Sequence, residues 1–259
     1  MKKYLFKTAL LIVALILLGC NKDDDKQTIF LPTRVEMIYP TSSASYQTLD
    51  IMYNDDFSIS RVTRNLSDNS KIIYDCNYNE LKLLSNLKIT EIASSTEKNY
   101  QIQYANGYVF KITETNTSGG FSEFNIDYNS ITNTYKYNFP YTWKFNESND
   151  LDYYFFSNIA TLQVTYEEGK GFNHFMKPQP VLAILDSYFA TNFFQDLYFM
   201  SSKPIIKMRF EDLISSDIIE YNYTNTFSSN NNLLNCEIRI NDEVNPATIK
   251  NITYEERTF

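Results

Sequence analysis

Few side chains in this sequence could carry out acid–base or nucleophilic chemistry. His174 is the only histidine, so a Ser-His-Asp or Cys-His arrangement would have to use it. It lies in the irregular, aromatic-flanked stretch 171–176, and the chain has no Gly-x-Ser-x-Gly nucleophile motif. Zinc needs three or four histidine or cysteine ligands, more than the chain supplies. We therefore expect a protein that is not an enzyme and uses no cofactor or metal.

Carboxylates are plentiful but lack the spacing of a known site. The triplets at 23–25 (Asp-Asp-Asp) and 54–56 (Asn-Asp-Asp) offer oxygens to calcium, yet neither has the alternating acids and closing glutamate of an EF-hand loop. A charged spacer and a hairpin turn are the better interpretations. Two acids could also hydrolyse a glycosidic bond, but among 31 aspartates and glutamates their presence alone indicates nothing.

Aromatic side chains are the more informative group. The chain has 21 tyrosines, 19 phenylalanines and one tryptophan, and exposed aromatic faces stack on sugar rings or make adaptable protein contacts. Trp143 could contact a ligand in this way, although core packing is its expected role. In Tyr153–Phe156 successive side chains point to opposite faces of a strand, so at least half should be buried.

Cys76 and Cys236 are the only cysteines besides Cys20. Outside the cytoplasm a disulfide between them could form, and it would stabilise the fold by about 4–5 kcal/mol in the chain-entropy model. Both also stand in strand-like sequence, where cysteine is common as a small core residue. The sequence leaves the two alternatives open.

The amino terminus has the order of a secretory signal peptide. Three lysines in the first seven residues precede an apolar stretch at 8–18, which is shorter than the roughly 20 residues of a membrane span. Residues 17–20, Leu-Leu-Gly-Cys, resemble the lipobox of bacterial lipoproteins. The resemblance implies that a signal peptide, residues 1–19, is removed and that the Cys20 sulfur carries a diacylglycerol. Each buried lipid methylene contributes about 0.8 kcal/mol to such an anchor.

The charged segment after Cys20 is expected to be a flexible spacer, extending over residues 20–30. Its polar residues cannot pack into a core. Lys22, Asp23, Asp24 and Asp25 resemble the export signal of surface-exposed lipoproteins in the Bacteroidota. That resemblance implies a lipid-anchored protein of the outer membrane, exposed at the cell surface, with the periplasmic face as the alternative.

The charge balance argues against nucleic acid as a partner. The net charge of −8 becomes −11 once the three signal-peptide lysines are removed. An acidic surface repels phosphate backbones, and no basic patch compensates for it.

Residues 31–259 are expected to form a single β-rich domain. Runs such as 34–39, 48–53 and 121–128 alternate apolar and polar residues as half-buried strands do. Tyrosines that end such runs recur about every 25 residues, at Tyr53, Tyr78, Tyr104, Tyr128 and Tyr154. The first four of these are followed at once by turn-forming residues. The sequence thus predicts a mainly β fold, a long antiparallel meander of hairpins. Asparagine, with 28 residues against 6 glycines, is expected in the turns.

One helical insertion interrupts the meander near residues 180–200. From Pro180 onward the apolar residues take the 3.6-residue spacing of a helix, and proline suits a first helical turn. A helix there would cover an apolar face of the sheet. Strand-like sequence resumes after Pro204.

The Tyr-Asn turns resemble, in degenerate form, the YD-type repeats of bacterial surface proteins. With the lipobox, the acidic spacer and the closing Ile252–Arg257, they resemble a class of uncharacterised Bacteroidota lipoproteins with domains of unknown function. We expect a lipid-anchored outer-membrane envelope lipoprotein, a non-catalytic binding or structural module. Its partners are expected to be the membrane, reached through the lipid anchor, and a glycan or an envelope protein.

Three other functions stay open. One is a glycan-binding component of a nutrient uptake system, which predicts exposed aromatic side chains on one face. Another is a periplasmic carrier of lipid or lipoprotein, in which a curved sheet and the helix enclose an apolar cavity. The last is a hydrolase, which predicts a polar cleft near His174 or a pair of carboxylates.

Overall fold

The computed structural model of the chain describes residues 28–40, 46–138, 141–175, 179–189 and 200–258. In this part of the chain there are one α-helix, α2 (Pro180–Phe189), and 17 strands. The strands in chain order are β1 (Thr28–Ile38), β2 (Tyr46–Tyr53), β3 (Ile59–Asn65), β4 (Lys71–Tyr78), β5 (Leu84–Glu91), β6 (Thr96–Ala105), β7 (Tyr108–Asn116), β8 (Phe121–Asn125), β9 (Asp127–Asn129), β10 (Thr134–Tyr137), β11 (Tyr141–Phe145), β12 (Leu151–Phe156), β13 (Ala160–Tyr166), β14 (Ile205–Asp212), β15 (Ile218–Phe227), β16 (Leu233–Ile240) and β17 (Thr248–Thr258).

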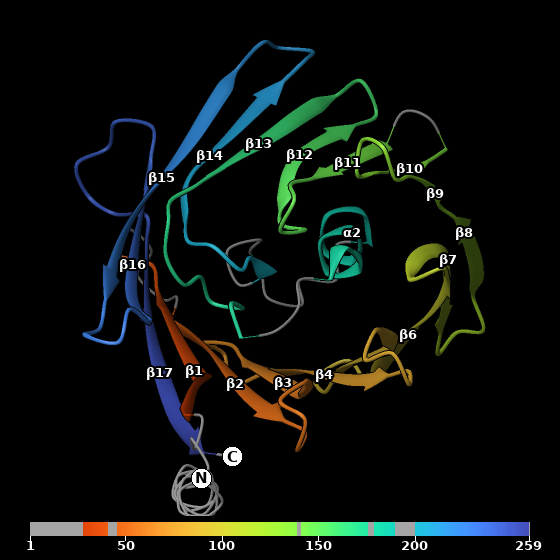
Figure 1. The fold of residues 1–259 in the computed structure, drawn as a ribbon, viewed down its shortest axis with the longest axis horizontal. Helices are drawn as coiled ribbons and strands as arrows, with labels where there is room; N and C mark the ends of the chain where they lie inside the picture. Colours follow the sequence, from red (N-terminus) through yellow and green to blue (C-terminus); the bar gives the residue numbers. More distant parts are fainter. Residues whose placement is uncertain (1–27, 41–45, 139–140, 176–178, 190–199, 259) are drawn as a thin grey trace, which may run out of the picture. The chain divides into compact units, whose positions relative to one another are not determined.

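The strands form one antiparallel sheet that curls into a nearly closed barrel (Figure 1). Successive strands pair along the chain, and β1 pairs with both β17 and β2, which joins the two ends of the meander. β8 and β9 are separated only by Ile126, with β8 paired to β7 and β9 to β10. The antiparallel meander and the helix at Pro180 are confirmed, while residues 190–199 of the expected helix lie outside the described residues.

Several hairpin turns share one arrangement that explains the choice of asparagine. At Asn79, Asn116 and Asn146 the side-chain Oδ1 accepts hydrogen bonds from the backbone N–H groups two and four residues later. Such an Asx turn is held by its own first side chain. The fourth position has a positive φ angle in each turn: 59° at Lys82, 80° at Gly119 and 61° at Asn149. Asparagine at the first position therefore fixes the turn, so few glycines are needed.

Four tyrosine hydroxyls fasten neighbouring strands together at the end of the barrel where the Asn79 and Asn146 turns lie. Each donates a hydrogen bond to a backbone carbonyl of the preceding strand: Tyr53 to Pro32 (2.6 Å), Tyr104 to Leu84 (2.7 Å), Tyr166 to Leu151 (2.6 Å) and Tyr254 to Leu233 (2.8 Å). Burial raises the pKa of Tyr104, Tyr166 and Tyr254, so these hydroxyls stay protonated donors. We call this end of the barrel, defined by the four tyrosines, the tyrosine rim.

The 25-residue spacing of tyrosines identifies only part of this set. Tyr53 and Tyr104 belong both to the predicted period and to the rim. Tyr154 does not end a strand, because β12 continues to Phe156 and the rim position on that hairpin belongs to Tyr166. The spacing fails there because β8 to β12, of three to six residues, are shorter than β1 to β7, which have seven to eleven.

The core lies inside the barrel and is organised around α2 (Figure 1). Residues Val181 to Leu185 of the helix are all buried. The indole N–H of Trp143, on β11, donates to the Ser187 hydroxyl at 2.7 Å. Rings of Tyr188 and Phe189 meet strand aromatics edge-on, with centroids 4.6 to 5.8 Å apart: Tyr188 with Tyr137, Tyr141 and Phe124, and Phe189 with Tyr100 and Phe124. The helix thus covers the inner, apolar face of the sheet.

The other face of the sheet carries cross-strand ion pairs. They alternate along the strands with the buried residues and recur around the barrel: Arg34–Asp50 (3.1 Å), Arg61–Asp75 (2.6 Å), Lys88–Glu97 (2.8 Å), Lys111–Glu123, Lys144–Asp152 (3.1 Å) and Lys207–Glu220 (2.7 Å). Exposed pairs of this kind contribute about 0–1 kcal/mol each. Their value here is that they mark the outward face of the sheet, opposite the core.

All the described core residues and strand pairings fall between residues 28 and 258. A chain that begins at residue 21 therefore contains the whole sheet, α2 and the core, and it has what it needs to fold without the amino-terminal segment.

Removing one rim hydroxyl should destabilise the barrel. Tyr254→Phe leaves the Leu233 carbonyl without its donor, which should lower the free energy of unfolding by about 1–2 kcal/mol. Urea unfolding of the chain from residue 21 measures the change. The matched control is Tyr46→Phe, whose hydroxyl bonds to Glu36 on the exposed face and should change stability little. Equal effects of the two variants would contradict the role of the rim.

Candidate binding site

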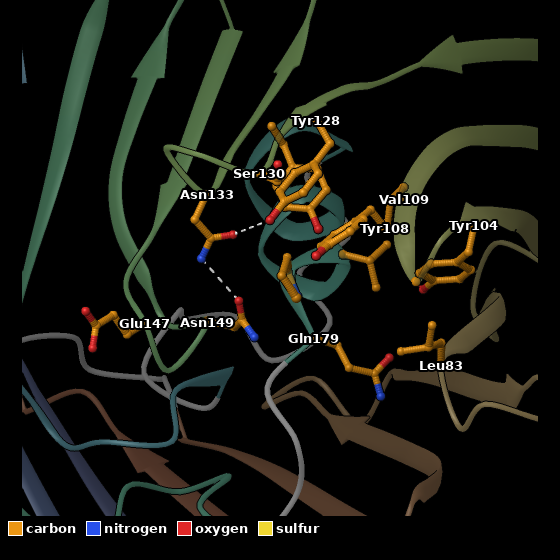
Figure 2. Close-up of a pocket in the computed structure, with 14 residues that line it drawn as sticks. Leu83, Tyr104, Tyr108, Val109, Tyr128, Ser130, Asn133, Glu147, Asn149 and Gln179 are labelled. Carbon is orange, nitrogen blue, oxygen red and sulfur yellow. Dashed lines mark hydrogen bonds between the residues drawn. The ribbon is translucent and has the colours of Figure 1, made fainter.

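A pocket of about 440 Å³ opens at the tyrosine rim (Figure 2). It is formed by the β4–β5, β6–β7, β9–β10 and β11–β12 turns and by the start of α2. The residues that line it are aromatic, amide-bearing or small: Leu83, Tyr104, Gly107, Tyr108, Val109, Tyr128, Ser130, Asn133, Tyr135, Glu147, Asn149, Gln179, Pro180 and Val181. Segments up to about a hundred positions apart in the chain are thus brought to one opening.

Three tyrosine rings packed on one another form one wall of the pocket. The Tyr108 and Tyr128 rings lie nearly parallel, with centroids 3.9 Å apart and planes at 19°. The Tyr135 ring packs on Tyr128 at 4.6 Å. Tyr135 is buried, whereas Tyr108 keeps 40% of its surface exposed. Burial, and then the neighbouring Tyr108 hydroxyl, raise the pKa of Tyr128. The wall therefore offers an aromatic surface anchored in the core.

Amide side chains held by the fold form the polar edge. Asn133 accepts a hydrogen bond from the Tyr128 hydroxyl at 3.0 Å and donates to Oδ1 of Asn149 at 3.2 Å. Both asparagines have positive φ angles, 48° and 61°. Across the pocket, Gln179 accepts from the Leu84 N–H at 2.8 Å. These bonds fix the amides before any ligand arrives.

The lining offers aromatic faces and amides that suit stacking and hydrogen bonding. Glu147 is the one acidic side chain among the described lining residues, and no histidine, lysine or cysteine joins it. A nucleophile with an adjacent base, or a pair of carboxylates, cannot be assembled from this set. Aromatic faces beside fixed amides can stack and form hydrogen bonds.

The predicted lipidation and export residues lie outside the described residues. This applies to Cys20, Lys22, Asp23, Asp24 and Asp25. Their roles stay predictions from the sequence.

Trp143, considered as a ligand contact, is fully buried instead. Its ring stacks on Tyr154 with centroids 5.3 Å apart, and its N–H is bonded to Ser187. The side chain faces the inside of the barrel rather than an exposed surface, so it cannot meet a ligand at the surface.

The structure has no disulfide between Cys76 and Cys236, both of which are described and buried. The reason is topological. Cys76 is on β4, whose neighbours are β3 and β5, whereas Cys236 is on β16, between β15 and β17. Of the two alternatives, the structure supports the buried core residue.

The other residues considered for chemistry, His174 and the Asn54-Asp55-Asp56 triplet, are engaged in bonds that hold their own loop or turn. The Nδ1 of His174 lies 3.0 Å from the Gly171 carbonyl within its own loop, and burial lowers its pKa. Asn54-Asp55-Asp56 forms the β2–β3 turn, where Asp56 Oδ1 accepts from the N–H and hydroxyl of Ser58. In the described ranges, no three metal-binding side chains cluster.

The described helix is also too short to cross a bilayer: none in this part of the chain is both long and apolar enough.

Sequence reasoning missed most of the rim pocket. Tyr104 and Tyr128 were found as members of a repeat, and the turn at Asn106-Gly107 was recognised, but no pattern pointed to Asn133 or Gln179. Gln179 contacts Leu84, 95 positions away in the chain, a pairing visible only in the fold.

Comparisons with known proteins give distant structural likenesses only. No family model matches the chain, and no curated protein matches it. A porin-like protein from Bacteroides uniformis matches with a TM-score of 0.46 and 14% identity, over 86% of this chain and 96% of its own. A porin-like protein from Bacteroides vulgatus gives 0.41 and 9%, over 88% and 99%. The Photorhabdus luminescens Tc holotoxin pore gives 0.21 and 9%, over 84% of this chain and 9% of that one. The fold described above rests on the strand pairing of this chain alone.

His174 should make the fold sensitive to mild acid. Because burial lowers its folded-state pKa below the ordinary 6.5, the unfolded chain binds the proton more readily. The stability that comes from keeping His174 neutral is therefore fully present above pH 6.5, and it is lost as the pH falls below that value. Urea unfolding at pH 7.5 and 5.5 should show a loss that is smaller in His174→Gln. An identical loss in both proteins would contradict this origin.

Proposed function

We propose that this chain is a lipid-anchored envelope protein of the outer membrane whose barrel is immersed in water and binds a ligand at the tyrosine rim. It is a non-catalytic binding module, and its bilayer contact is made by the acyl chains on Cys20. The observation that carries this proposal is the distribution of charge and apolar surface between the two faces of the sheet.

The outward face is unsuited to lipid. In a membrane-spanning barrel the outward residues form an apolar band, and a charged residue at mid-membrane costs about 2–4 kcal/mol. Here the outward positions carry ion pairs on β1–β2, β3–β4, β5–β6, β7–β8, β11–β12 and β14–β15. The buried apolar side chains form one core inside the barrel that includes α2. This arrangement favours a barrel surrounded by water. The protein is then held to the membrane by a lipid anchor outside the barrel.

The amino-terminal sequence supplies the anchor in this proposal. The lipobox-like residues 17–20 provide the acylated cysteine, and the acidic residues 23–25 direct the protein to the cell surface. Two or more acyl chains are needed for stable attachment, because one alone binds a bilayer only marginally.

The lining of the rim pocket favours a sugar ring or a short glycan as ligand. A sugar ring presents an apolar face and a polar rim of hydroxyls, which match an aromatic wall and fixed amides. Tyr108 supplies the exposed ring, and Asn133, Asn149 and Gln179 supply donors and acceptors around it. This chemistry is that of the glycan-binding alternative raised by the sequence.

Exchanging the leader tests whether the barrel or the lipid holds the protein to the membrane. Residues 1–20 are replaced by a signal peptide that is cleaved without lipid attachment, so that the barrel enters the periplasm unchanged. We expect the protein in the aqueous fraction, because its outer face is charged. Fractionation followed by immunoblotting measures the distribution.

The control is the same fusion with residues 17–20 restored, which should return the protein to the membrane fraction and add the mass of the acyl chains. Retention of the non-acylated protein in carbonate-washed membranes would contradict an immersed barrel. An unmodified Cys20 in the native protein would contradict the anchor.

Substituting Tyr108 tests the rim pocket. On an array of mono- and oligosaccharides, Tyr108→Ala should weaken binding by about tenfold because the stacking surface is lost. Tyr108→Phe keeps the ring and should bind nearly as the native chain does. Tyr46→Ala, on the exposed outer face, is the matched control. Unchanged binding in Tyr108→Ala, or no binding to any sugar by the native chain, would contradict a glycan site.

A further inference from the structure

A second pocket, of about 330 Å³, lies inside the barrel between α2 and the inner face of β12, β13 and β14. Its volume falls at the lower end of the roughly 300–1,000 Å³ typical of small-molecule sites. Tyr154, Phe156, Leu162 and Phe210 line it from the strands, and Asp186 and Ser187 line it from the helix. It shares no lining residue with the rim pocket, so it is a separate place in the fold.

The lining of this interior pocket is apolar apart from Thr161, the Tyr154 hydroxyl and the helix residues Asp186 and Ser187. Leu162 pairs with Phe210 across β13 and β14, and Tyr154 pairs with Leu162 across β12 and β13. In an antiparallel sheet directly paired residues share a face, so these three side chains present one continuous surface to α2. A ligand here would bury its apolar part against rings and branched carbons.

One polar atom in the pocket lacks a partner. The Tyr154 side chain is only 7% exposed, and its hydroxyl has no hydrogen-bond partner in the described structure. The neighbouring Ser187 hydroxyl donates to the Ala183 carbonyl at 2.6 Å and accepts from Trp143 at 2.7 Å, and it lies near the Tyr154 hydroxyl without completing a hydrogen bond to it. Leaving a buried hydroxyl unsatisfied costs about 1–3 kcal/mol, and buried polar groups are nearly always bonded. An acceptor brought in by a ligand would remove this cost.

The charge of the lining limits what the ligand can be. Asp186 is the one carboxylate among the described lining residues, and no described lining residue is basic. A free fatty acid would bring its carboxylate into a setting of low dielectric where no described lining residue is basic enough to pair with it, which is unfavourable. An ester, amide or alcohol oxygen accepts a hydrogen bond without adding charge.

We propose that the interior pocket binds an uncharged aliphatic molecule, an acyl chain whose ester or amide oxygen accepts a hydrogen bond from the Tyr154 hydroxyl. The chain lies along Phe156, Leu162 and Phe210, and the oxygen faces Tyr154 at the helix. This gives the protein a second ligand class, distinct from the sugar proposed at the rim, and a role in holding or carrying acylated molecules.

The only tryptophan of the chain reports on this pocket. Trp143 stacks on Tyr154, so a ligand that bonds to the Tyr154 hydroxyl should change Trp143 fluorescence. The chain from residue 21 is titrated with three probes that share a ten-carbon chain: methyl decanoate, decanoate and decane. We expect methyl decanoate to bind about fivefold more tightly than decane, which lacks the acceptor, and more tightly than decanoate at pH 8.

Tyr154→Phe removes only the hydroxyl. It should weaken methyl decanoate binding about fivefold and leave decane binding unchanged. Without ligand it should unfold at a higher temperature than the native chain, because an unsatisfied buried hydroxyl is gone. A structural role for the hydroxyl would instead lower the unfolding temperature. Tyr46→Phe, on the outer face, is the matched control and should change neither property.

Ala160→Leu tests the space itself. Ala160 lines the pocket and is 2% exposed, so the larger side chain should fill part of the volume and weaken the binding of all three probes. Native mass spectrometry gives the stoichiometry, expected to be one ligand per chain. The proposal is overturned if the native chain binds none of the probes, if decanoate binds best, or if Tyr154→Phe binds methyl decanoate as the native chain does.

Discussion

A wide closed sheet must have its inside filled, and the rest of this structure depends on how that is done. Barrels of about eight strands can be filled by their own side chains, whereas those of 16–18 strands leave a channel unless something occupies it. With 17 strands in the part of the chain that the structure describes, this barrel is in the wider class. The α2 helix and a large number of inward-pointing rings fill the interior, anchored by the bond from Trp143 to Ser187. The aromatic excess is therefore a consequence of barrel width.

The same constraint separates the two faces of the sheet. Once apolar rings are committed to the inside, the period-2 alternation of each strand sends its polar residues outward. Those residues pair across neighbouring strands, as Arg61 does with Asp75. A barrel built in this way is apolar inside and charged outside, the reverse of a barrel that faces lipid and encloses water. The two pockets follow from imperfect filling: one lies where the turns of the tyrosine rim leave an opening, and the other lies beside α2.

Much of the fold could be predicted because its signals are local. Alternation marked the strands, the spacing after Pro180 marked α2, and the Tyr-Asn pairs marked several hairpin ends. The closure of the sheet could not be predicted, because β1 must find β17 across more than 200 positions and no local pattern records that pairing. The tyrosine period failed at Tyr154 for a related reason. Shorter strands there moved the rim position to Tyr166, which depends on register rather than spacing.

The candidate sites were less accessible from the sequence than the fold. Trp143 attracted attention as the single tryptophan, yet it packs under α2, while the neighbouring Tyr154 carries the unsatisfied hydroxyl. Ser187 accepts a hydrogen bond from the indole, whereas the Tyr154 hydroxyl beside it completes none. At the rim, Tyr108 and Gln179 become neighbours only when four turns meet at one end of the barrel. Contacts between residues so far apart in the chain produce no periodic pattern in the sequence.

Hydrogen exchange of the α2 backbone tests the filled interior most directly. If the helix is part of the core, the amides of residues 184–188 should exchange only with global unfolding, as slowly as those of the central strands. Exchange as fast as that of an isolated ten-residue helix, while the strands stay protected, would show that the barrel holds together without α2 and would contradict this account of the fold.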